Sequence, residues 1–131
     1  MAFKLCKTDD GHTPAWEYLP AAAITPKPGM ALAWSGGKLA VATGTTAPAY
    51  VSMMGSDAAL TAGTLIPVIR VQKNMSFRTV ASAALTDINC GDKVTLHASN
   101  GMEITATKTN GVAEIVSMDG TAVGSEVLVR F

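Results

Sequence analysis

The sequence predicts an all-β protein: a small β-barrel domain of two similar halves, preceded by an extended N-terminal arm. Three observations support this fold class. Apolar and polar residues alternate in short runs, turn-forming dipeptides separate those runs, and one block of sequence occurs twice. Only 15% of the 131 residues are charged and the formal net charge is zero. A neutral, charge-poor surface favours association with other molecules.

Residues 1–28 differ from the rest of the chain and form the predicted arm. Prolines recur through them, and each proline fixes its own φ and pushes the preceding residue towards extended geometry, which excludes a regular helix. The arm is also rich in large side chains, which a disordered tail would lack. We therefore expect the arm to dock, either on its own body or on a neighbouring subunit or partner. The candidate partner-binding residues are Phe3, Leu5, Trp16, Tyr18 and Leu19.

Residues 29–131 form the predicted barrel domain. Period-two alternation is clear in Leu39–Thr43, Met75–Thr79, Val94–Ala98 and Ile104–Ala106. Dipeptides such as Asn100-Gly101 lie between such runs and supply the positive φ that tight hairpins need. Short strands at this spacing are typical of a barrel or a sandwich.

Three segments of this domain do not fit the alternating pattern. Pro67 interrupts an apolar run and predicts an edge strand or a bulge. Residues 56–62 have the capping residues of a short helical turn. Residues 81–87 could form one helical turn or an irregular crossover, and we favour the crossover.

A degenerate internal repeat is the basis for predicting two similar halves. Val51–Gly55 returns as Val116–Gly120, and residues 35–45 resemble residues 99–109. The segments that follow, 61–70 and 121–130, are also alike. The two halves are expected at about residues 29–71 and 91–131.

The sequence gives little support for catalysis. His12 and His97 are the only histidines, and the nucleophile, phosphate-loop and zinc-protease motifs are absent. His12 follows two aspartates, but a calcium loop needs more oxygen ligands at set spacing. Isolated carboxylates such as Glu17, Glu114 and Glu126 could be paired by the fold, although nothing in the sequence favours it. We expect no enzyme activity, no cofactor and no metal.

Charge pattern, apolar runs and cysteine usage limit the possible partners and the cell compartment of the protein. The sequence has no basic stripe with interleaved aromatic residues, so nucleic-acid binding is not expected. It also has no apolar run long enough to cross a membrane. The N-terminus lacks the apolar core of a signal peptide, so synthesis and retention in a cytoplasm are expected. Cys6 and Cys90 are far apart in sequence and are expected to be free thiols.

Several short motifs resemble capsid decoration (cement) proteins of tailed bacteriophages and prophages. In such families a glycine precedes a strand, a Gly-Val-Ala step lies in the middle, and the chain closes on a Gly-x-x-Val-x-Val pattern. The matching segments are Pro28–Leu32, Ser35–Ala40, Ile88–Val94, Gly111–Glu114 and Gly124–Phe131.

The resemblance implies a small β-barrel or β-tulip-like domain in a structural protein that adds no chemistry. It implies a homo-oligomer, a trimer, on the outer capsid surface of a virion, made in the cytoplasm of the bacterial host. The partner would be the major capsid protein, and the role would be to bridge neighbouring capsid subunits and stabilise the head. Many weak contacts in one oligomer would add up through effective concentration.

Two other functions stay open from the sequence. A carbohydrate- or receptor-binding β-module would need exposed aromatic residues beside polar groups, for which Trp34 and Tyr50 are the candidates in the body. Another head or tail component of a virion is the second alternative.

Overall fold

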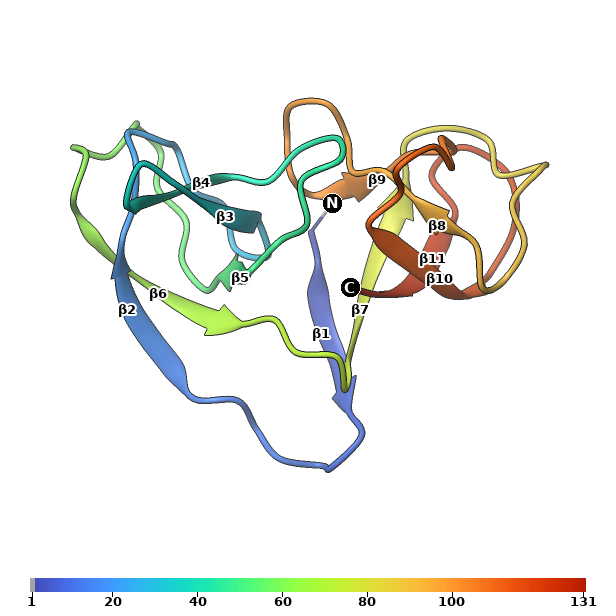
Figure 1. Ribbon diagram of the computed structural model, residues 1–131, viewed down its shortest axis with the longest axis horizontal. Coiled ribbons are helices and arrows are strands. Elements are labelled where there is room, and N and C mark those ends of the chain that lie inside the picture. Colours follow the sequence, from blue (N-terminus) through green and yellow to red (C-terminus); the bar gives the residue numbers. More distant parts are fainter. Residues whose placement is uncertain (1) are drawn as a thin grey trace.

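The computed structural model describes residues 2–131 and confirms the all-β class. Eleven strands form two sheets that are almost entirely antiparallel, and residues 2–131 contain no helix (Figure 1). We call the two sheets A and B. Each contains strands from distant parts of the chain.

Sheet A is built mainly from the C-terminal half. Its strands follow the order β1-β7-β11-β10-β8, with β9 pairing β7 in parallel. An isolated antiparallel bridge also joins Leu96 to Ile104. The strands are β1 (Lys4–Thr8), β7 (Met75–Ala81), β8 (Lys93–Val94), β9 (Glu103–Ile104), β10 (Ala113–Met118) and β11 (Glu126–Arg130).

Sheet B is built from the N-terminal half. Its order is β2-β6-β5-β3-β4, and every pair in it is antiparallel. An isolated parallel bridge between Ala21 and Leu39 joins the end of β2 to β4 at the other edge. The strands are β2 (Trp16–Pro20), β3 (Ala31–Ser35), β4 (Lys38–Val41), β5 (Tyr50–Ser52) and β6 (Leu65–Arg70).

The N-terminal segment 1–28, predicted as an arm, contributes a strand to each sheet. β1 pairs with β7 in sheet A and β2 pairs with β6 in sheet B. The loop between β1 and β2 projects beyond both sheets (Figure 1). Of the two docking modes expected for this segment, the structure therefore has it packed on its own chain.

The apolar core consists of two clusters. The larger one is built mainly on sheet A and also includes Ala31, Val51 and Ile69 of sheet B. It contains two of the three phenylalanines, Phe3 and Phe77, with Phe131 packed against it. The smaller cluster lies inside sheet B and includes Leu32, Leu39 and Ile66. A single closed barrel over residues 29–131 is not what these two sheets form, because the chain divides its apolar residues between two centres.

Several local predictions can be compared with the observed strands. Residues 82–87 are irregular, as expected, and residues 56–62 do not form the expected helical turn. Pro67 lies within β6 and not in an edge strand. The proline is tolerated because the β5 ladder ends at the Ser52–Val68 pair, so its missing N–H removes no bond to β5.

Candidate functional site

The five candidate partner-binding residues differ sharply in exposure. Phe3 is only 1% exposed, and its ring lies 5.3 Å from that of Phe131, so it belongs to the core. Leu5 and Leu19 are half-buried against the sheet A and sheet B clusters, respectively. Trp16 and Tyr18 are 53% and 62% exposed. These two are the candidates that remain available to a partner.

Trp16 and Tyr18 are the centre of an apolar patch on the outer side of β2 and β6. They are two residues apart on a strand and therefore point to the same side. Tyr18 pairs with Pro67, and Pro20 pairs with Leu65, which is 60% exposed. We call Trp16, Tyr18, Pro20, Leu65 and Pro67 the β2–β6 patch. Leu65 was not among the predicted residues, although it begins the apolar run that Pro67 interrupts.

A further exposed aromatic residue lies elsewhere on sheet B. Trp34, on β3, is 48% exposed and makes an edge-to-face contact with Tyr50 at 5.7 Å between ring centroids. The Arg70 guanidinium lies 5.6 Å from the centre of the Tyr50 ring. Tyr50 itself is buried, so Trp34 is the only one of these two aromatic rings that a ligand could cover.

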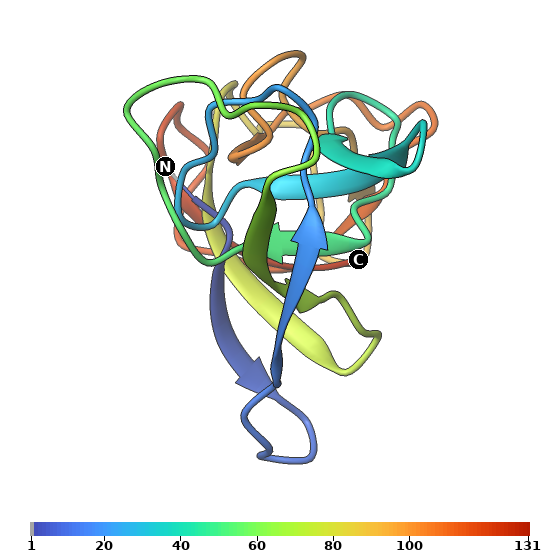
Figure 2. The same cartoon turned by 90° about the vertical axis from the view of Figure 1, so that its left-hand side faces the viewer.

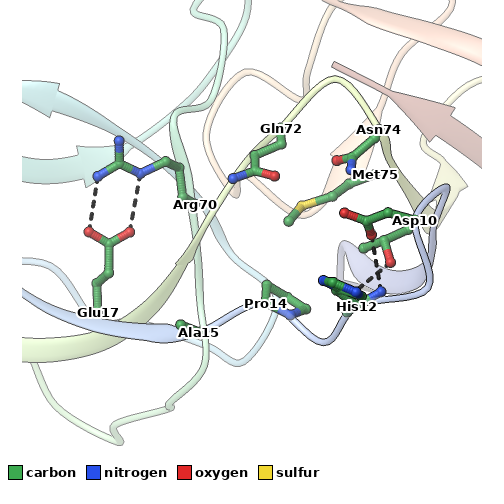
Figure 3. Close-up of a pocket in the computed structure, with 10 residues that line it drawn as sticks. Asp10, His12, Pro14, Ala15, Glu17, Arg70, Gln72, Asn74 and Met75 are labelled. Atoms are coloured by element: carbon green, nitrogen blue, oxygen red, sulfur yellow. Dashed lines mark hydrogen bonds and ion pairs between the residues drawn. The ribbon is translucent and has the colours of Figure 1, made fainter.

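A small polar hollow lies between the β1–β2 loop and β6 (Figure 3). Its volume is about 150 Å³, and Glu17 and Arg70 lie at one end with Asp10 and His12 at the other. Arg70 donates two hydrogen bonds to Glu17, at 3.0 and 3.2 Å, and this lowers the pKa of Glu17. The main-chain N–H of His12 donates to Asp10 at 3.0 Å and lowers the pKa of that carboxyl.

Both carboxylates in the hollow are thus held ionised by hydrogen bonds. A general acid needs the opposite shift, a pKa raised towards neutrality. His97, the other histidine, lies far along the chain in a turn where its Nδ1 accepts the N–H groups of Ser99 and Asn100. Neither carboxyl of the hollow therefore has the raised pKa of a general acid.

In residues 2–131, no three His, Cys, Asp or Glu side chains come together as metal ligands. Cys6 and Cys90 are both free and exposed, as expected. Within the same residues, no helix is long and apolar enough to cross a membrane.

The site is thus an exposed aromatic patch on a small all-β protein. Comparisons with known proteins add no identity to it, since no family model, curated protein or solved structure matches the chain. The exposed aromatic patch is therefore the main indication of function in this protein.

We expect the Arg70→Gln variant to raise the pKa of Glu17 towards the ordinary glutamate value, because the variant lacks the guanidinium that holds the carboxylate ionised. The lowered pKa in the folded protein means that the pair stabilises the fold above the ordinary pKa of about 4.3. This contribution is lost as the pH falls through the folded-state pKa. A carboxyl ¹³C NMR titration measures the shift.

Arg78→Gln is the matched control, because Arg78 pairs with Glu126 on sheet A. It should leave the Glu17 titration where it is in the wild type. An unchanged Glu17 midpoint in Arg70→Gln would contradict the assignment.

Proposed function

We propose that this chain is a capsid decoration protein of a tailed bacteriophage or prophage. It binds the outer capsid lattice, bridges neighbouring major capsid subunits and stabilises the head. It acts as a homo-oligomer, a trimer, and requires no catalytic group, cofactor or metal. The support is the family resemblance of the sequence together with an all-β body whose polar hollow holds its carboxylates in structural hydrogen bonds.

The observation that carries the proposal is the β2–β6 patch. Trp16, Tyr18 and Leu65 expose large apolar surface side by side, at about half or more of each residue's area. Tryptophan and tyrosine dominate the binding energy of many protein interfaces, because they bury a large area at low entropic cost. A patch of this kind on an otherwise charge-poor surface is a place for a protein partner.

We expect the double variant Trp16→Ala/Tyr18→Ala to lose binding to phage capsids that lack the protein. Loss of a central aromatic anchor costs about 2 kcal/mol or more in binding, a factor of about 30 in affinity. Co-sedimentation with the capsids measures this. Both side chains are exposed, so the variant should fold as the wild type does.

Trp34→Ala provides the matched control, since Trp34 is exposed to a similar degree but lies on β3, outside the β2–β6 patch. It should bind capsids as the wild type does. If the double variant still binds and Trp34→Ala does not, the patch has been assigned to the wrong aromatic residues.

A carbohydrate-binding function is the second candidate, and one contact favours it. Trp34 stands against Tyr50 beside the Arg70–Glu17 pair, which places an exposed aromatic ring near groups that donate and accept hydrogen bonds. Sugar recognition uses such combinations. Hits on a glycan array that disappear in Trp34→Ala would select this function over capsid binding.

We further propose that the chain consists of two copies of one five-stranded unit, β2–β6 and β7–β11. The order of pairing supports this, because β2-β6-β5-β3-β4 has the counterpart β7-β11-β10-β8 with β9 beside β7. Matching main-chain hydrogen bonds support it too. Ala21 donates to Thr64 at 2.9 Å as Ala81 donates to Ser125 at 3.0 Å, and Ala22 donates to Leu39 as Ser82 donates to Ile104, both at 2.8 Å.

A further inference from the structure

The two proposed units differ in one respect: the first strand of only one of them has a neighbour on its outer side. β7 is flanked by β11 on one side and by β1 on the other, with Lys4 opposite Arg78 and Leu5 opposite Phe77. The matching hydrogen bonds of Ala21 and Ala81 put β2 and β7 in register. Arg78 of β7 then corresponds to Tyr18 of β2, and Phe77 corresponds to Glu17. Within residues 2–131, no strand pairs with β2 at those positions on the side away from β6.

The main chain of β2 is oriented to accept such a neighbour. The Ala21 N–H points to the β6 side, where it donates to Thr64, and the Ala22 N–H points to the opposite side, where it donates to Leu39. Successive residues of a strand alternate in this direction. The N–H and C=O groups of Trp16 and Tyr18 therefore face outward, along an edge that lies at the surface of the molecule (Figure 2).

The edges of β1 and β2 are protected very differently. β1 carries Lys4 and Lys7, and its ladder is interrupted by a bulge between Leu5 and Lys7. Lysines and bulges are the usual devices that prevent an edge strand from pairing with other chains. β2 has neither a lysine nor a bulge, and its register with β6 is unbroken from Trp16 to Pro20. Its one proline, Pro20, is the last residue of the strand and lies outside Trp16–Leu19.

We propose that the outer edge of β2, at Trp16–Leu19, accepts an extended strand of the partner protein, which adds to sheet B as β1 adds to sheet A. The inference rests on the proposed function, which gives the partner as the major capsid protein. The added strand runs antiparallel to β2 and bonds to the main chain of Trp16 and Tyr18. Its side chains on the face of Trp16 and Tyr18 cover the two exposed aromatic rings.

A proline at position 18 separates main-chain pairing from side-chain docking. Tyr18→Pro removes the outward N–H but leaves the bonds between β2 and β6 in place, because proline is tolerated where the N–H faces away from the sheet. Tyr18→Ala removes the same ring and keeps the N–H. We expect Tyr18→Pro to bind capsids about tenfold more weakly than Tyr18→Ala, with thermal unfolding of both variants checked first.

Hydrogen exchange provides the second measurement. In the wild-type protein bound to capsids, the amides of Trp16 and Tyr18 should exchange much more slowly than in the free protein. The Leu5 amide, which by the same alternation faces outward from β1, serves as the internal comparison and should change little.

The outcomes separate the two proposals. If Tyr18→Pro and Tyr18→Ala bind alike and the amides stay unprotected, strand addition is wrong while capsid binding stands. If the wild-type chain alone forms a dimer that Tyr18→Pro disrupts, the occupant of the edge is a second copy and the proposal is overturned. If the wild type does not bind capsids at all, the proposed function fails and the assignment of the edge fails with it.

Discussion

Replacing Phe77 by alanine is expected to lower the free energy of unfolding by about 3–5 kcal/mol. Phe77 is fully buried on β7, the strand between β1 and β11 in sheet A. Its ring lies 5.5 Å from that of Phe131, which in turn contacts Phe3. Truncation leaves a cavity where the first and last strands of the chain meet. Urea unfolding followed by tryptophan fluorescence measures the loss.

Phe131→Ala is the comparison within the same aromatic cluster. Phe131 is only half-buried, so less apolar surface is lost and the surroundings can relax into solvent. Its cost should be clearly smaller than that of Phe77→Ala. An equal or larger cost would mean that the centre of the cluster is at Phe131 instead of β7.

Gly111→Ala is expected to destabilise the fold by about 3 kcal/mol. A Cβ at this position would overlap the main chain of Lys93 and lie 2.6 Å from the amide nitrogen of Val94. The neighbour is backbone and cannot rotate away, so β8 would have to separate from β10, to which it pairs through Val94 and Ala113. Thermal unfolding followed by circular dichroism tests this.

Gly120→Ala is a matched control at a second glycine without positive φ. Its nearest neighbour would be the hydroxyl of Ser125 at 3.2 Å, a side-chain atom that can turn away. We expect a change within about 0.5 kcal/mol. A large loss at both positions would show that the cost is one of backbone freedom and not of the contact with Lys93.

Local alternation predicted four of the eleven strands of this protein, β4, β7, β8 and β9. The Leu39 and Met75 runs became β4 and β7, because each buries one face of a sheet. The sequence could not show that Val94–Ala98 shortens to the two residues of β8, since that length depends on where β10 begins. Division of the core into two clusters was not predictable either, because it depends on contacts between distant strands.

The candidate site was only partly predictable for a similar reason. The period of two indicates that Trp16 and Tyr18 share a side, but which side faces solvent depends on the pairing of β2 with β6. Phe3 was chosen as a contact residue because it lies in the proline-rich arm. The pairing of β1 with β7 places it in the core instead, next to Phe131.

The pairing of the first two strands with β7 and β6 also has a consequence during synthesis. Lys4 pairs with Arg78, and Trp16 pairs with Ile69. Neither pair can form until the middle of the chain has emerged from the ribosome. Closing such long loops is entropically costly and slows folding. Until then Phe3 and Trp16 stay exposed to solvent in the nascent chain, and a chaperone would bind the segment that carries them.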